Sequence, residues 1–177
     1  YIESISDVIN SAEVVVADCN LSQETILKLK DICKVPLYVD TVSVSHADKI
    51  KGHLEGIDTI KPNLLEAEFL TDMIIESEYD CLEAARALIN QGVRRVFISM
   101  GPDGMIAADK DHAILADRYP VTVKSTTGAG DSAMAAIVWS TLNEEGDGLT
   151  EPAMAANAAA SATISVDPTI HPGMSVD

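Results

Sequence analysis

The sequence has few basic and few aromatic residues. Only 12 lysines and arginines stand against 28 aspartates and glutamates, which gives a formal net charge of -16, and aromatic residues make up 4% of the 177 residues. An acidic surface repels polyphosphates and anionic lipids. The composition therefore argues against nucleic acid and membranes as partners. Any nucleotide must be held by local backbone dipoles and a cation.

Cysteine and long apolar runs are also scarce. The three cysteines, Cys19, Cys33 and Cys81, form no Cys-x-x-Cys pair, which favours a reducing compartment over a disulfide framework. The longest apolar stretch, residues 153–166, is rich in small residues and too short to cross a bilayer. No basic segment precedes an apolar run near Tyr1, as a secretory signal would require. We expect a soluble, cytoplasmic protein.

The sequence does contain a regular alternation of β-rich and helical segments. We predict strands over residues 13–17, 36–40, 59–61 and 95–99, a hairpin running from the turn 102–104 into 105–108, and helices over 22–33, 63–72, 80–91, 130–142 and 152–166. This alternation is typical of an α/β fold with a largely parallel sheet between helical layers. The length suits one domain over residues 1–177.

The segment 124–131, Lys-Ser-Thr-Thr-Gly-Ala-Gly-Asp, is the strongest candidate for chemistry. Gly128 and Gly130 leave backbone N–H groups uncovered where a helix begins, and that end of a helix attracts anions. Asp131 then places a carboxylate beside the bound anion. A carboxylate repels a phosphate there, unless its task is to take the proton from the group that attacks the phosphate. The segment therefore predicts phosphoryl transfer.

Two other interpretations of this segment were weighed. Residues 128–133 match the dinucleotide fingerprint G-x-G-x-x-A, but that motif requires a second parallel strand downstream, and the sequence after Trp139 contains no β-rich run. A Walker A motif is absent as well. In the other interpretation, Thr126 or Thr127 is an N-cap and Asp131 merely stabilises the helix dipole. The segment alone does not decide between this capping role and catalysis.

Two further motifs precede this segment. In residues 61–68, Asn63 and Glu66 have the spacing of a helix-capping box, and the same two side chains suit a triphosphate with Mg²⁺, which usually keeps several waters. In residues 99–104, Ser99, Gly101 and Gly104 follow a buried strand. Ligands bind at such strand ends in α/β sheets, although a tight turn explains the glycines equally well.

In this order, the three motifs resemble those of the ribokinase-type (PfkB) carbohydrate kinases. The resemblance covers nearly the whole chain, and within the family the segments 16–22, 38–43, 61–68 and 98–101 are most similar to the pseudouridine kinases. It implies a three-layer αβα fold and ATP-dependent phosphorylation of the 5′-hydroxyl of pseudouridine. Another sugar or sugar-phosphate kinase, or a non-catalytic nucleotide-binding module, is the alternative.

The resemblance also implies roles for individual residues. Asp131 is the expected base, and Gly128, Ala129 and Gly130 form the anion hole. Expected contacts to ATP come from Asn63, Ser99, Gly101, Gly104, Thr126 and Asn157. Glu66 is expected near Mg²⁺, Ser125 and Thr127 near a monovalent cation such as K⁺, and Asn20 and Asp40 on the acceptor side.

The sequence also departs from the family pattern. Many members have aspartate where this chain has Ser125. The sequence Lys124-Ser-Thr is more similar to that of the phosphofructokinase branch. Both activation by K⁺ and the identity of the substrate therefore stay open. Members are also considerably longer. We expect that the N-terminal part with the sugar-covering lid is missing and that residues 1–177 alone are inactive. A homodimer and a fusion or pathway link to a pseudouridine-5′-phosphate glycosidase are further expectations from the resemblance.

Overall fold

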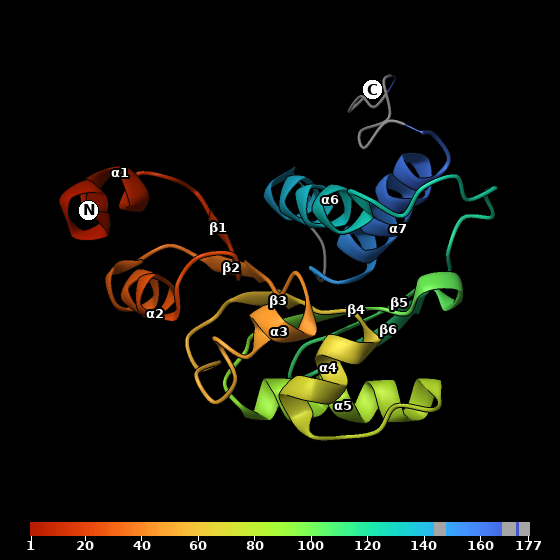
Figure 1. The fold of residues 1–177 in the computed structure, drawn as a ribbon, viewed down its shortest axis with the longest axis horizontal. Helices are drawn as coiled ribbons and strands as arrows, with labels where there is room; N and C mark the ends of the chain where they lie inside the picture. Colours follow the sequence, from red (N-terminus) through yellow and green to blue (C-terminus); the bar gives the residue numbers. More distant parts are fainter. Residues whose placement is uncertain (144–147, 168–172, 174–177) are drawn as a thin grey trace.

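The fold is a six-stranded sheet with helices on both faces (Figure 1). The computed structural model describes residues 1–143, 148–167 and 173. The strands are β1 (Val15–Asp18), β2 (Leu37–Asp40), β3 (Thr59–Lys61), β4 (Arg95–Ser99), β5 (Met105–Ala108) and β6 (Ala113–Ala116), and they lie side by side in sequence order. The first four strands are parallel, whereas β4–β5 and β5–β6 pair antiparallel. The predicted α/β fold with a largely parallel sheet is confirmed.

The helices form the two outer layers. The helices are η1 (Ile2–Ile5), α1 (Ser6–Asn10), α2 (Gln23–Ile32), α3 (Val44–Ala47), α4 (Leu64–Thr71), α5 (Glu78–Asn90), η2 (Gly101–Asp103), α6 (Ala129–Asn143) and α7 (Thr150–Ile164). Figure 1 shows α2 to α5 below the sheet and the antiparallel pair α6 and α7 above it. Among the described helices, none is long and apolar enough to span a membrane.

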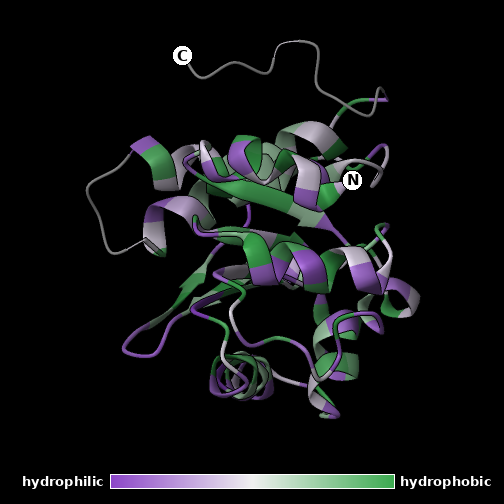
Figure 2. Cartoon of the chain, turned by 90° about the vertical axis from the view of Figure 1, so that its left-hand side faces the viewer, coloured by the Kyte–Doolittle hydropathy of each residue, from purple (hydrophilic) through white to green (hydrophobic). Residues whose placement is uncertain are grey.

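Alternation along the strands builds a separate apolar core on each face of the sheet. In β4, Val96 and Ile98 pack with the helices α2 to α5, whereas Phe97 between them packs with α6 and α7, because successive side chains of a strand point to opposite faces. Ile137 of α6 is fully buried in this second core. In Figure 2 the strands are mostly green, while the helices on both sides mix green and purple. Both faces of the sheet are therefore covered.

The predicted elements are largely confirmed, and several short ones were missed. The strands 59–61 and 95–99 are found with the predicted bounds, and the turn at 102–104 does lead into a hairpin. Among the short elements that were not predicted are α3 and β6. Each has four residues, and β6 is a partly exposed edge strand. The dinucleotide fingerprint would require a second parallel strand after α6. In the described chain the next element is helix α7, and residues 144–147 lie outside the described part.

The four parallel strands end at the same edge of the sheet, and each ends on a polar residue. These last residues are Asp18 of β1, Asp40 of β2, Lys61 of β3 and Ser99 of β4. The carboxyl ends of parallel strands are where open α/β sheets bind ligands. The fold therefore gathers two acids, one base and one hydroxyl at this edge.

Candidate active site

Two cavities meet at the first turn of α6. The first, here named the Asn63 cavity, has a volume of about 370 Å³, and the second, named the Asp131 cavity, about 460 Å³. Ala129 and Gly130 line the Asn63 cavity, whereas the next residue, Asp131, lines the Asp131 cavity. Consecutive residues of a single helical turn thus line two different spaces.

The Asn63 cavity collects residues from separate parts of the chain. All six residues predicted to contact ATP line it, namely Asn63, Ser99, Gly101, Gly104, Thr126 and Asn157. Met105, Ala133 and Ile164 add apolar surface. A cavity with mainly apolar walls and a few converging polar groups is the usual form of a small-molecule site. The predicted contacts therefore share one space, although their contact with ATP stays a prediction.

The start of α6 has the geometry of an anion site. Gly128, with φ of +82°, immediately precedes the helix, which begins at Ala129. Neither Thr126 nor Thr127 therefore occupies the N-cap position that the alternative interpretation assigned to them. The N–H of Ala129 donates to the carbonyl of Thr126 over 3.4 Å. The N–H groups of Gly130 and Asp131 are the ones that the first turn of a helix leaves without a carbonyl of its own.

An ion pair lies directly beside this turn. Lys61 Nζ is 3.1 Å from Asp40 Oδ2, and the two side chains are only 6% and 13% exposed. A Cβ atom built on Gly130 would be 3.5 Å from Lys61 Nζ and 4.0 Å from Asp40 Oδ2. Asp40 lines the Asp131 cavity and Lys61 the Asn63 cavity. The pair therefore marks the border between the two spaces.

The Asn63–Glu66 motif forms the capping box at the start of α4. Asn63 Oδ1 accepts from the Glu66 N–H over 3.0 Å, and Glu66 Oε2 accepts from the Asn63 N–H over 2.9 Å. Glu66 also accepts from the Asn63 amide and from the Thr41 hydroxyl, and it is 4% exposed. A parallel bridge between Asn63 and Ser99 joins this motif to the end of β4. Both interpretations of the motif stay compatible for Asn63, which lines the Asn63 cavity, whereas Glu66 is not among the residues that line it.

The carboxylate of Glu66 suits an indirect role toward a metal. Its oxygens already accept hydrogen bonds from Asn63 and Thr41. Within the described residues, no group of three or more His, Cys, Asp or Glu side chains is placed to hold a metal ion. Mg²⁺ in such sites usually arrives with substrate phosphates and keeps several waters. The residues present fit an ion that is carried by a nucleotide and is contacted through water.

The segment predicted to hold a monovalent cation is anchored to the end of α7. The N–H groups of Lys124 and Ser125 both donate to the carbonyl of Ile164, over 2.8 and 3.4 Å. Ser125 Oγ accepts from the Thr127 N–H over 3.3 Å. These bonds position the loop that leads to Gly128. The role of Ser125 and Thr127 toward K⁺ stays a prediction.

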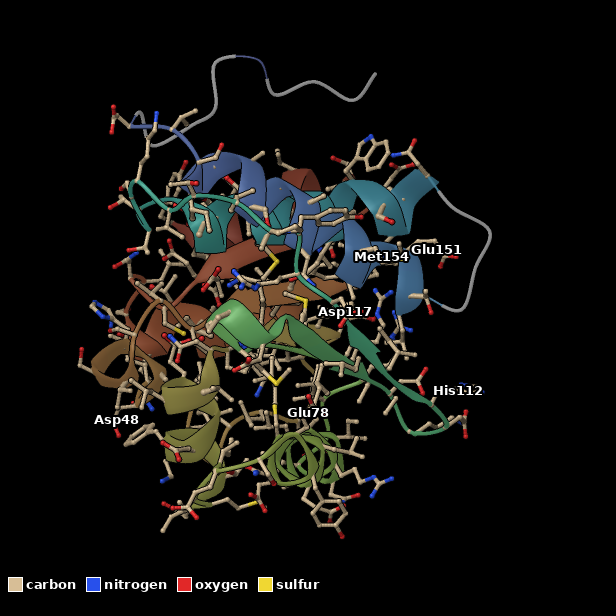
Figure 3. The ribbon with its side chains drawn as sticks, turned by 90° about the vertical axis from the view of Figure 1, so that its right-hand side faces the viewer. Asp48, Glu78, His112, Asp117, Glu151 and Met154 are labelled. Carbon is tan, nitrogen blue, oxygen red and sulfur yellow. The ribbon has the colours of Figure 1, made fainter. Side chains whose placement is uncertain are left out.

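Two of the predicted contact residues also have structural partners. The amide of Asn157 donates to the carbonyls of Ala116 and Asp117, over 2.8 and 3.1 Å. It thereby ties α7 to the end of β6, and Figure 3 shows Asp117 just below α7. Gly104 has φ of +91°, and a Cβ atom there would be 2.2 Å from the carbonyl oxygen of Ala116. Both residues are thus needed for local packing as well as lining the cavity.

On the acceptor side, the structure separates the two predicted residues. Asp40 lines the Asp131 cavity together with Asp18. Asn20, in contrast, is not among the lining residues, and its side chain donates to Asp18 Oδ2 over 3.1 Å. Lys49 Nζ donates to the carbonyls of residues 19, 20 and 21 and so fixes this loop. Asn20 therefore orients Asp18, for which no role was predicted.

Known proteins resemble this chain along nearly its whole length. The model of the pfkB family carbohydrate kinases matches residues 4–175. The chain belongs to the pfkB family of carbohydrate kinases. Pseudouridine kinase of Escherichia coli is 32% identical over 180 residues, which cover 99% of this chain and 56% of that enzyme. An uncharacterized sugar kinase of the same organism is 38% identical over 140 residues, covering 77% of this chain and 38% of the relative.

A solved structure agrees with this assignment. A Clostridium perfringens protein assigned as a sugar kinase superposes with a TM-score of 0.89 at 32% identity, covering 98% of this chain and 54% of that one. The pfkB chain therefore spans about half the length of the relatives that it matches. Enzymes of this family transfer phosphoryl groups to hydroxyl groups. The fold expected from the resemblance is confirmed, including the ribokinase-like arrangement of the sheet and its helical layers.

Lys61 is the first residue of the segment 61–68, and the sequence did not predict a role for it. The available signal was a charged residue at the end of a buried strand, directly before Pro62 and Asn63. Its partner Asp40 is 21 positions earlier in the chain, and only the parallel pairing of β2 with β3 brings the two together. Arg118, which also lines the Asn63 cavity, was missed because it lies in an irregular segment after β6.

Proposed function

We propose that this chain is the C-terminal, nucleotide-binding part of a kinase that transfers the γ-phosphoryl group of ATP to the 5′-hydroxyl of pseudouridine. The observation that carries the proposal is the first turn of α6. Its residues Ala129 and Gly130 line the Asn63 cavity, and Asp131 lines the Asp131 cavity. In-line phosphoryl transfer needs the nucleotide on one side of the transferring group and the acceptor hydroxyl on the other, and this turn lies between two such spaces.

In the proposed reaction, ATP occupies the Asn63 cavity with its adenine toward Asn157. Mg²⁺ bound with the nucleotide would neutralise charge on its phosphates, and Glu66 would act on it through water. The Asp131 carboxylate takes the proton of the acceptor hydroxyl. The hydroxyl oxygen then bonds to the γ-phosphorus while the bond to the bridging β–γ oxygen breaks and ADP leaves. The N–H groups of Gly130 and Asp131 stabilise the transferring group.

Electrostatics favour an uncharged acceptor. The charged residues that line the Asp131 cavity are all carboxylates, those of Asp18 and Asp131 and that of Asp40, whose charge is offset by its ion pair with Lys61. A substrate that already carried a phosphate would be repelled by them. A nucleoside or free sugar, whose hydroxyls donate hydrogen bonds to carboxylates, fits better. Among such acceptors, the 32% identity to pseudouridine kinase supports the nucleoside, and the 38% identity to a sugar kinase supports a free sugar as the second candidate.

The acceptor is identified by an ADP-release assay on the intact protein with pseudouridine, uridine, ribose and fructose 6-phosphate. We expect the highest kcat/KM with pseudouridine and none above background with fructose 6-phosphate. A preference for the sugar phosphate would contradict the electrostatic argument. A protein that binds ATP but phosphorylates none of the four acceptors would support a non-catalytic module instead.

The base is tested with Asp131→Asn. Turnover should fall about 10²–10⁴-fold, which is the usual contribution of a positioned general base. Asp48→Asn is the matched control, because Asp48 is an exposed carboxylate after α3, as Figure 3 shows. We expect the control to keep normal turnover. Near-normal turnover of Asp131→Asn would exclude this residue as the base.

A further inference from the structure

A buried lysine occupies the border between the two cavities. The Lys61 side chain is 6% exposed, and among the residues that the structure describes it forms its ion pair with Asp40. Removing an ammonium and a carboxylate from water costs several kcal/mol each, and their attraction often does no more than offset that cost. Apolar residues would fill the same space at least as favourably. Stability therefore does not explain why a charged pair lies here.

The position of the ammonium suggests another reason. Lys61 Nζ lies 3.5 Å from where a Cβ atom on Gly130 would be, so it faces the turn whose N–H groups attract anions. Of the residues that line the Asn63 cavity, Lys61 and Arg118 are the basic ones, and Arg118 is exposed. In a chain with a net charge of -16, Lys61 is the buried cation next to the reacting groups.

Asp40 holds this ammonium in a fixed place. Its Oδ2 pairs with Lys61, and its Oδ1 accepts from the Val42 N–H over 3.0 Å. Val42 has φ of +65°, a left-handed conformation that is unfavourable for a β-branched residue. Strain of this kind persists where surrounding structure imposes it, often at functional sites. Both oxygens of Asp40 are thus engaged, one by backbone and one by the lysine.

We propose that Lys61 is a catalytic residue that donates a hydrogen bond to the phosphoryl group during transfer, and that Asp40 is the positioning residue for its ammonium. The proposal rests on the proposed kinase function. Charge on the transferring group spreads over its equatorial oxygens, and a fixed ammonium stabilises that charge without reorganisation. Asp40 then belongs to the phosphoryl site, in addition to bordering the acceptor space.

Kinetics of the intact protein test the role of Lys61. Lys61→Met should lower kcat about 10²–10³-fold, as the loss of one fixed donor to a transition state does, with the acceptor KM changed less than about threefold. Lys61→Arg should recover part of the loss because it restores the charge. Lys51→Met is the matched control, since Lys51 pairs with Asp72 and lines neither cavity. A Lys61→Met enzyme with kcat within threefold of wild type would overturn the proposal.

The split between kcat and KM tests Asp40. Asp40→Asn leaves the ammonium in place but loosely held, so kcat should fall at least tenfold while the acceptor KM stays within threefold. A rise in acceptor KM with unchanged kcat would assign Asp40 to substrate binding and overturn its positioning role.

Nucleotide binding provides a readout that needs no turnover. In the double variant Lys61→Met/Asp40→Asn, no unpaired charge is left buried, so the fold should be preserved. Its dissociation constant for ATP should rise about tenfold, the cost of one charged hydrogen bond, while that for AMP stays within twofold. Equal changes for ATP and AMP, or none for either, would contradict the contact between Lys61 and the phosphates.

These outcomes separate the two proposals. A wild-type protein that binds ATP with this Lys61-dependent preference, yet phosphorylates no acceptor, contradicts the kinase function and leaves the phosphate contact supported. A wild type that transfers phosphate normally and is unaffected by Lys61→Met contradicts the phosphate contact alone. A wild type that binds neither ATP nor AMP contradicts both.

Discussion

Gly130 has no side chain, so its backbone stays accessible at the proposed phosphate site. Its backbone lies beside the Lys61–Asp40 pair, with 3.5 Å between the place of a Cβ atom and Lys61 Nζ. That distance is an ordinary contact, so the fold tolerates a methyl group there. The methyl group would, however, occupy the space between the helix N–H groups and the ammonium, where we expect a phosphate. We therefore expect glycine to be required here by the ligand and not by the backbone.

This difference predicts opposite effects of Gly130→Ala on stability and activity. Alanine is favoured over glycine inside a helix by up to about 1 kcal/mol, so the free energy of unfolding should stay the same or rise. Phosphoryl transfer by the intact protein should fall at least tenfold because the anion can no longer approach the backbone. Chemical denaturation and the ADP-release assay measure the two effects. A variant that loses stability, or keeps full activity, would contradict this account.

The cysteines show how burial limits reactivity. Burial, followed by the nearby carboxylate of Asp40, raises the pKa of the Cys19 thiol to about 12, and burial raises that of Cys81 to about 11. Because the thiolate is the reactive form, both residues are protected at neutral pH. The expectation that the three cysteines are free thiols agrees with the structure.

Helix caps connect secondary structure with the site. The start of α4 is fixed by Asn63, which also lines the Asn63 cavity, whereas the start of α2 is fixed by Ser22, whose hydroxyl accepts from the Thr25 N–H over 3.2 Å. Both residues are N-caps, but only one of them borders a cavity. A comparison of Asn63 with Ser22 therefore distinguishes what an N-cap contributes to stability from what it contributes to function.

We predict that Asn63→Ala and Ser22→Ala each lower the free energy of unfolding by about 1 kcal/mol, the usual value of an N-cap. Only Asn63→Ala should also weaken ATP binding, because only Asn63 borders the proposed nucleotide cavity. Urea denaturation and calorimetric titration with ATP provide the two measurements. If both variants bound ATP like wild type, Asn63 would be a structural cap and no more.

Long-range ion pairs hold the molecule together at the opposite edge of the sheet. Asp58, just before β3, pairs with Arg94 and Arg95, just before and at the start of β4. Arg95 also donates to the Tyr38 hydroxyl of β2 and to the carbonyl of Gly148 before α7. This cluster therefore links three strands to the α6–α7 layer. Burial alone would raise the pKa of Asp58, but hydrogen bonds from Arg94 and Thr59, with the charges of both arginines, lower it.

The lowered pKa of Asp58 predicts a loss of stability in acid. A carboxyl with a lower pKa in the folded state stabilises the protein above its ordinary pKa, near 3.8, and this contribution is lost as the pH falls through the folded value. Asp58→Asn should therefore be less stable than wild type at neutral pH, and the difference should shrink below about pH 4. Thermal unfolding between pH 7 and pH 2 measures this. A difference that stays constant over the range would contradict the assignment.

The periphery of the molecule is separate from these sites. Figure 3 shows His112 at the outer tip of the hairpin β5–β6 and Met154 on α7, both away from the sheet edge where the parallel strands end. His112 lies 3.8 Å from Asp109 of the same turn and lines neither cavity at α6. The chemistry expected of this chain is thus concentrated at one edge.

The sequence by itself determined the elements and most of the candidate site. Short continuous β-rich runs made the buried strands recognisable, and local motifs predicted helices that begin near Asn63 and Gly130, because capping and turn geometry depend on residues only a few positions apart. The same local rules did not find β6, a partly exposed edge strand, or α3, which is a single helical turn. They also left the capping and catalytic interpretations of both motifs open.

Only the tertiary structure decided which of these residues meet. Parallel pairing of β2 with β3 brought Asp40 to Lys61, and the packing of α6 on the sheet placed Gly130 beside them. The tertiary structure also placed the Asn20 side chain in a hydrogen bond with Asp18, and it formed two cavities that share the first turn of α6. Such contacts join residues that are distant in the chain, and they form only because burying two apolar faces of one sheet fixes the order and register of its strands.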